Sequence, residues 1–244
     1  MNILEEFFLK VYVPIKFFGI DISITNLVVW MFAATVGVFV VLFLLSRNMK
    51  ILPNKRQTFV EFIYYFIDKS IIGLAIGRGG EKWMPFLGTI FIFIFANNII
   101  GLIPHSYTPT SNPIVPATLA IVVFFTIHVT NIKRNGITGY LRSFVPRGVP
   151  IWMLPLVIPI EIISTIAKPF SLLVRLTANM LAGHIVILVL ISLILLFKSY
   201  LIAIPVLPFT VIIYIFELFV AGLQAYIFTI LSAVYIGEAI HPRH

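Results

Sequence analysis

Long uncharged stretches alternate with short polar or basic segments along this chain of 244 residues. Residues 22–46, 84–103 and 117–132 carry no charge, and the third stretch begins near Ile114. Two longer apolar segments follow at residues 152–197 and 201–240. A helix of about 20 apolar residues crosses a hydrocarbon core of about 30 Å. The pattern therefore predicts an all-α membrane protein with about five membrane helices.

The last two apolar segments are each longer than one membrane crossing requires. A single helix over residues 161–196 would extend about 54 Å, so it either breaks in two or tilts steeply. No basic or turn-rich loop divides it, and we therefore predict that the last two helices form a long, steeply tilted hairpin. Pro155 and Pro159 suit the beginning of the first helix, Pro169 is expected to kink it, and Gly183 is the only later helix breaker.

Residues 59–72 are apolar except for Glu61, Asp68 and Lys69, which share one side of a helix. A segment this short and amphipathic is expected to lie in the membrane interface. The glycines in residues 77–80 predict a flexible turn, because no phosphate-binding loop motif accompanies them anywhere in the chain. We therefore do not expect the chain to bind ATP itself.

The composition supports a single integral membrane domain over residues 1–244, since the chain is 60% hydrophobic and only 11% charged. The net charge is +8, but the cationic residues lie in short loops between apolar spans. The preference of basic residues for the cytoplasmic side explains this distribution, and no nucleic-acid partner is expected. The chain has no cysteine, which excludes disulfides and thiolate metal sites.

Basic residues cluster at 47–56 and 133–147, and both loops are expected to face the cytoplasm or the mitochondrial matrix. The proline-rich residues 105–116 then form an outside loop, and residues 1–21 are an amphipathic lead-in outside the membrane. This topology places the N-terminus outside and the C-terminus inside.

The segment 152–197 is apolar, yet it contains five functional candidates, namely Glu161, Lys168, Arg175, Asn179 and His184. Ionisable groups at membrane depth are costly and face a bundle interior, a cavity or a partner. At about 100° per residue, the first three lie within roughly 40° of one another and Asn179 lies about 40° farther round. His184 lies on roughly the opposite side of the helix, about 180° from Arg175.

A wider pattern of residues resembles the a subunit of rotary ATP synthases, most closely its alphaproteobacterial and mitochondrial branch. It consists of the Ser171-Leu172-Leu173-Val174-Arg175-Leu176 motif with Asn179, Gly183 and His184, then Glu217 and Leu223-Gln224-Ala225-Tyr226-Ile227-Phe228. The resemblance implies a multi-pass protein of the bacterial inner membrane, or alternatively of the mitochondrial inner membrane. Implied partners are the c-subunit ring, b-type peripheral stalk subunits, the rest of the ATP synthase and lipid. It implies no cofactor, no metal and no catalytic residue.

The resemblance places Arg175 between an inlet and an outlet half-channel, facing the carboxylates of the c-ring. A guanidinium group suits this role, because it is always protonated and offers five donors, so it attracts a carboxylate without accepting its proton. The alternative is a structural ion pair of Arg175 with Glu161 or Glu217.

The inlet is expected to contain His184 and Glu217, since imidazole titrates near physiological pH and the family carries an interchangeable acidic and histidine pair there. Gln224 shares a helix face with Glu217 and could orient water or bond to a rotor carboxylate. The resemblance favours a position near the inlet for Asn98. Amides at this depth, such as Asn97 and Asn98, are at least as often interhelical hydrogen-bond partners.

Glu161 is the candidate for the outlet path. Lys168 is expected to neutralise Glu161 or to extend toward the interface as structural support, and Ser171 and Gly183 are also supporting residues. Gly222 is expected to let another backbone approach closely. A lone histidine, His128, is interpreted as a packing residue.

Two other classes of function compete with proton translocation. A secondary transporter or anion channel could hold an anionic solute with Lys168 and Arg175, but such folds show internal repeats. The chain contains only a weak sign of a repeat, in which Pro155, Pro159 and Glu161 would correspond to Pro205, Pro208 and Glu217. A membrane-embedded enzyme lacks support, because the metalloprotease and serine-hydrolase motifs are missing. The residues favour the ion-translocating a subunit.

Cysteines introduced at Lys50, Thr110 and Arg142 test the topology, because the chain has no cysteine of its own. Thr110→Cys should be labelled by an impermeant thiol reagent from the outside, and the other two from the inside. Labelling of all three from one side would contradict the topology.

Overall fold

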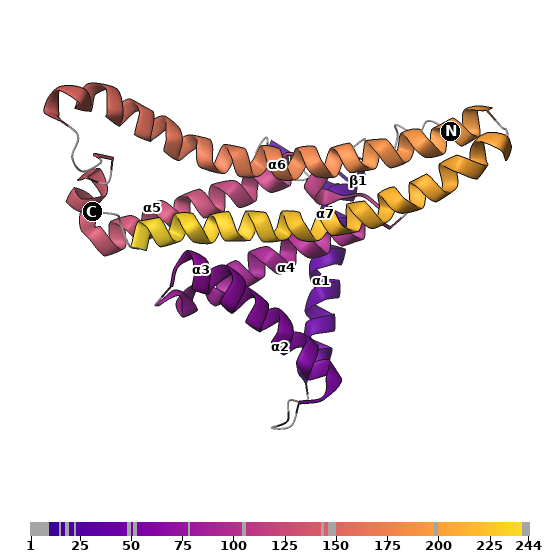
Figure 1. Cartoon of the computed structure of the whole chain (residues 1–244), viewed down its shortest axis with the longest axis horizontal. Coiled ribbons are helices and arrows are strands. Elements are labelled where there is room, and N and C mark those ends of the chain that lie inside the picture. The colour runs from indigo at the N-terminus through magenta and orange to yellow at the C-terminus, as the bar shows by residue number, and fades with distance from the viewer. Residues whose placement is uncertain are drawn as a thin grey trace. The chain divides into compact units, whose positions relative to one another are not determined.

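The computed structural model describes residues 10–14, 16–17, 20–21, 23–47, 50, 53–77, 79–103, 106–142, 144–145, 150–197 and 200–240. Helices dominate this part of the chain (Figure 1). Within it, 5 helices are long and apolar enough to cross a membrane, at Asn26–Ser46, Gly80–Gly101, Ile114–Leu141, Leu154–Ile194 and Ala203–Ile240. The predicted all-α membrane fold is confirmed.

The elements follow one another in this order. The short strands are β1 (Val11–Val13), β2 (Lys16–Phe17), β3 (Ile20–Asp21) and β4 (Ile24–Thr25), in which β1 pairs with β4 and β2 with β3, both antiparallel. The helices are α1 (Asn26–Ser46), α2 (Lys55–Ile67), the π-helix Asp68–Ile72, α3 (Gly73–Ala75), α4 (Met84–Gly101), α5 (Ile114–Arg142), α6 (Leu154–Phe197) and α7 (Tyr200–Ile240). Short 3₁₀ turns lie at Gly80–Trp83, Pro109–Ser111 and Ile151–Met153.

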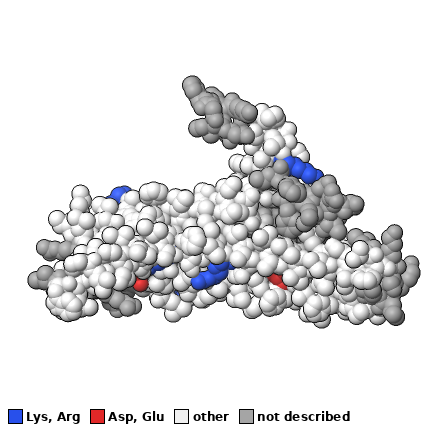
Figure 2. Space-filling view, turned by 90° about the horizontal axis from the view of Figure 1, so that it is seen from above, with Lys and Arg blue, Asp and Glu red and all other residues white. Residues whose placement is uncertain are grey.

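The chain divides into two compact units. The first unit comprises Met1–Val60, Ile92–Asn112 and Leu176–Ala225, and the second comprises Glu61–Phe91, Pro113–Arg175 and Tyr226–His244. Helices α2, α4, α6 and α7 therefore contribute residues to both units. Charged side chains are sparse on the face of the molecule seen in Figure 2, in keeping with the apolar composition.

The last two helices are antiparallel, and they contact each other in each unit (Figure 1). Helix α6 has 44 residues and continues through Pro159, Pro169 and Gly183 without a break. Pro155 lies in its first turn, as expected. The predicted hairpin is confirmed, and its steep tilt in a bilayer stays a prediction.

The segment expected at residues 59–72 is helical, as α2 followed by the π-helix. In the second unit its buried isoleucines Ile67, Ile71 and Ile72 form a core with Ala233 and Ile236 of α7. Burial of this apolar surface stabilises the packing of the segment against α7. Other apolar side chains of α2 stay exposed, namely Phe59, Phe62, Tyr64 and Tyr65.

Helix α5 extends beyond Ile132, where the sequence predicted its end, and it is interrupted at Gly136. Gly136 has φ 69° and ψ 173°, a backbone conformation that is strained for residues with a Cβ atom. Beyond it, the Tyr140 hydroxyl returns to 3.1 Å from His128 Nδ1. The His128 ring also lies edge-on to Phe124. The interpretation of His128 as a packing residue stays a prediction, since its Nε2 atom is buried without a hydrogen-bond partner among the described residues.

Thr110 is fully buried, which makes it a poor site for the outside cysteine label. Pro113, three residues later, is exposed and is the better position for the same test.

Candidate functional site

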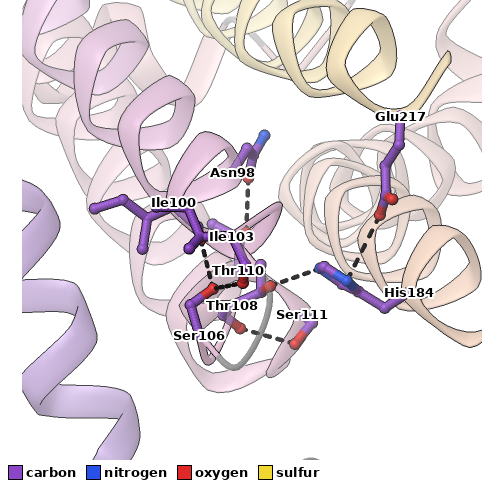
Figure 3. Close-up of polar contacts among 9 residues, drawn as sticks. All are labelled: Asn98, Ile100, Ile103, Ser106, Thr108, Thr110, Ser111, His184 and Glu217. Carbon is purple, nitrogen blue, oxygen red and sulfur yellow. Dashed lines mark hydrogen bonds and ion pairs between the residues drawn. The ribbon is translucent and has the colours of Figure 1, made fainter. Parts of the chain in front are cut away.

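A histidine and a glutamate face each other between α6 and α7 in the first unit (Figure 3). His184 Nδ1 lies 3.7 Å from Glu217 Oε1, and the two side chains are 18% and 4% exposed. Neither carboxylate oxygen of Glu217 has a hydrogen-bond partner among the described residues. A separation of 3.7 Å is longer than a hydrogen bond, so a proton can pass when the two groups move to hydrogen-bond distance or through one bridging water molecule. The pair predicted from the sequence is therefore formed.

Gly183 makes room for the Glu217 carboxylate. A Cβ atom at residue 183 would lie 2.6 Å from Glu217 Oε1 and 2.9 Å from Glu217 Cδ, closer than such atoms approach each other in proteins. The sequence suggested Gly183 as a helix breaker, but α6 continues through it. The absence of a side chain at Gly183 serves the packing of the site.

The loop between α4 and α5 reaches His184 from the other side. Thr108 Oγ1 lies 2.6 Å from His184 Nε2 in a hydrogen bond whose donor depends on the imidazole tautomer. Figure 3 shows the imidazole between this hydroxyl and the Glu217 carboxylate. The sequence did not indicate Thr108, because the two partners are 76 residues apart and nothing in a proline-rich loop marks one hydroxyl among several.

Asn98, near the end of α4, is fully buried and bonds to two other segments of the first unit. It donates to the Ala221 carbonyl of α7 at 3.1 Å and accepts from Thr110 Oγ1 at 2.7 Å. The interhelical hydrogen bond considered for this amide is confirmed. Its place beside the proton inlet stays a prediction.

Two more candidates of the first unit lie on α7. Gln224 is 5% exposed and follows Glu217 by seven residues, so both polar side chains belong to the buried part of this helix. Gly222 was expected to admit another backbone. This expectation is wrong, because a Cβ atom at residue 222 would have a side-chain atom, Phe95 Cε2, as its nearest neighbour, at an ordinary 3.7 Å.

The second unit contains three charged candidates, namely Glu161, Lys168 and Arg175. Lys168 Nζ forms an ion pair with Glu238 Oε2 at 3.1 Å and lies 4.9 Å from the Tyr235 ring centre. Of the two roles considered for Lys168, the pairing with Glu161 is not formed in the described part of this unit, and the role of structural support stays a prediction. The pair is half exposed, and such pairs contribute little to stability.

Arg175 and Glu161 are both half-buried on α6. Within the described part of this unit, the Arg175 guanidinium has no hydrogen-bond or ion-pair partner, so the structural pair with Glu161 is not formed. Asn179 and Ser171 are exposed. Among the described residues, no group of three or more His, Asp or Glu side chains could hold a metal ion.

The match to known proteins covers both units. The family model described as ATP synthase A chain matches residues 28–237. The chain belongs to the ATP synthase A chain family. It is therefore a multi-pass membrane protein and the a subunit of the proton-translocating sector of an ATP synthase. Membership in the ATP synthase A chain family also implies partnership with the rest of the ATP synthase complex.

Gly183→Ala should displace the Glu217 carboxylate, because the new methyl group would overlap it. The displaced carboxylate would no longer face His184, and we expect ATP-driven proton pumping by the assembled complex to fall about tenfold, which corresponds to about 1.4 kcal/mol in the activation free energy. Gly37→Ala in α1 is the matched control, since a Cβ atom there has nothing within 4 Å. Pumping by Gly183→Ala at the rate of the control would contradict this account of Gly183.

Proposed function

We propose that this chain supplies the inlet and outlet half-channels for protons, together with the arginine that faces the carboxylates of a c-subunit ring. The observation that carries the proposal is the buried contact between His184 and Glu217. Titratable side chains at membrane depth are energetically costly, and where they occur they mark ion pathways and proton relays. The chain acts as a stator and performs no catalysis, and the chemistry of ATP belongs to other subunits.

The inlet passes protons through His184 and Glu217. An imidazole can take a proton at one ring nitrogen and release it at the other, and the two nitrogens of His184 face different partners, Glu217 and Thr108. Gln224 cannot titrate, but its amide can orient water or bond to a rotor carboxylate. Asn98 of α4 accepts a hydrogen bond from Thr110, which lies in the same loop as Thr108, and Asn98 borders the inlet.

Arg175 separates the two half-channels. Its guanidinium group stays protonated and presents a planar fork that matches a carboxylate, and it has no partner within the described part of its own unit that would occupy it. A c-ring carboxylate that arrives without its proton is attracted to this fixed cation. Moving one charge across 100 mV is worth about 2.3 kcal/mol, so a leak past Arg175 would dissipate the driving force.

The outlet passes Glu161, with Asn179 and Ser171 on the exposed side of α6 toward the rotor. Lys168 lies in the same unit as Glu161 and pairs with Glu238. Beyond the c-ring, we propose contacts with b-type peripheral stalk subunits. The membrane is a bacterial inner membrane, or alternatively a mitochondrial inner membrane.

Arg175→Ala should assemble and fail to pump, because it removes the fixed cation without breaking a hydrogen bond or ion pair in the described part of its unit. Arg175→Lys should fail nearly as completely, since lysine keeps the charge and loses the planar fork. The measurement is ATP-driven acidification of inverted vesicles, with assembly and passive proton permeability followed in parallel. Arg134→Ala, which alters an exposed cation of α5, is the matched control. Near-normal pumping by a fully assembled Arg175→Ala complex would remove Arg175 from the mechanism.

The relay predicts a partial rescue. Glu217→His and His184→Glu should each lower pumping strongly, and the double exchange should retain more activity than either, because the pair at 3.7 Å needs two titratable groups in contact more than it needs their order. The double-mutant cycle measures the coupling, which for residues in contact is about 0.5–3 kcal/mol. A double exchange no better than the worse single variant would show that the two groups do not act as a pair.

A further inference from the structure

One hydroxyl group of the loop before α5 touches the relay directly. Thr108 Oγ1 is 2.6 Å from His184 Nε2, and Thr108 is 4% exposed. The contact is short for a nitrogen and an oxygen atom, which marks a well-formed hydrogen bond. Within this unit the imidazole is hydrogen-bonded to Thr108 at Nε2 and faces Glu217 at Nδ1, 3.7 Å away.

The two neighbours of an imidazole decide which nitrogen carries the proton. A neutral histidine has one N–H group and one lone pair, and an ionised carboxylate can only accept a hydrogen bond. With Nδ1 facing Glu217, the favourable tautomer has its proton on Nδ1 and its lone pair on Nε2. The Thr108 hydroxyl then donates to Nε2, and because it can rotate, it can also accept when the imidazole is fully protonated.

We propose that Thr108 is a positioning residue, which keeps the His184 ring in the orientation that directs Nδ1 at Glu217, where the carboxylate favours the tautomer protonated on Nδ1. This inference rests on the proposed inlet function of the pair. Thr108 neither takes nor passes the transported proton. It holds the imidazole in one orientation, so that Nδ1 stays directed at Glu217 and the relay does not have to wait for a ring flip.

The structure fixes Thr108 itself through the last turn of α4. Gly101 lies against the Thr108 side chain, and any Cβ atom at residue 101 would overlap that side chain. The Ser111 hydroxyl donates to the Thr108 carbonyl at 2.8 Å. The Ser106 hydroxyl donates to the Ile100 carbonyl at 2.5 Å and to the Ile103 carbonyl at 2.7 Å, which ties the start of the loop to α4 (Figure 3).

A second tie connects the loop to α7. Thr110 donates to Asn98, and Asn98 donates to the Ala221 carbonyl, one helical turn after Glu217. The loop is thus joined to α6 through Thr108 and to α7 through the bonds of Thr110 and Asn98. These two ties set the position of the hydroxyl relative to both members of the relay.

The test compares Thr108→Val with Thr108→Ser in the assembled complex. Valine has nearly the shape of threonine and lacks the hydroxyl, whereas serine keeps it. We expect Thr108→Val to lower ATP-driven proton pumping roughly tenfold, as for loss of a hydrogen bond to a buried polar group, and Thr108→Ser to retain most of the activity. Thr118→Val is the matched control, because the Thr118 hydroxyl bonds to the Ile114 carbonyl of its own helix.

A second measurement reports on the imidazole itself. Nitrogen NMR of the complex labelled at histidine distinguishes the two neutral tautomers, and the His184 signal is assigned by its loss in His184→Gln. The native complex and Thr108→Ser should show the tautomer protonated on Nδ1, and Thr108→Val should show a mixture. If Thr108→Val still shows only the tautomer protonated on Nδ1, as the native complex does, the proposal is overturned.

Two further outcomes separate this inference from the function on which it rests. If Thr108→Ser loses assembly and pumping as fully as Thr108→Val, then Thr108 only packs, and the positioning role is overturned. If His184→Gln pumps normally, the proposed inlet relay fails, whereas the tautomer measurement still decides whether Thr108 orients the imidazole.

Discussion

A backbone inside a hydrocarbon layer must satisfy its own hydrogen bonds, because no water is there to do so. This constraint accounts for the long helices, and it also governs their hydroxyl side chains. Within the spans, the hydroxyls of Thr35, Thr118, Thr126, Ser192 and Thr210 each donate to the carbonyl four residues earlier, a common arrangement in helices. These hydroxyls are satisfied within their own helices. Thr108 and Thr110 lie outside the membrane-spanning helices, and their hydroxyls reach His184 and Asn98 instead of a carbonyl one turn earlier.

Glycines enter this structure for two different physical reasons. Gly136 is required for its backbone, since its positive φ interrupts α5. Gly101 and Gly183 are required for the space beside them, because one lies against Thr108 and the other against Glu217. The side chains on either side of His184 are thus both packed onto glycines. A polar network in a dense interior needs room as much as it needs partners.

The two units handle charge differently. In the first unit a buried carboxylate faces a histidine at 3.7 Å, and its oxygens have no hydrogen-bond partner among the described residues. In the second unit Lys168 and Glu238 form a direct ion pair at 3.1 Å that is partly exposed. A direct pair holds its charges in place, whereas a looser contact leaves the groups able to exchange a proton with a neighbour. We therefore expect proton transfer in the first unit, where His184 and Glu217 face each other without a direct hydrogen bond.

The sequence by itself determined the spans, the hairpin of α6 and α7 and the pairing of His184 with Glu217, because the period of apolar residues and the family motif are local properties of the chain. It placed the end of α5 too early and did not indicate Glu238 as the partner of Lys168. It assigned no role to Thr108, and it listed Gly183 as a supporting residue and a possible helix breaker without identifying the space for Glu217. These features depend on which side chains meet after folding, across separations such as the 70 residues from Lys168 to Glu238 or the 76 from Thr108 to His184. Local periodicity contains no information about such contacts, and only the tertiary packing of the helices and the loop decided them.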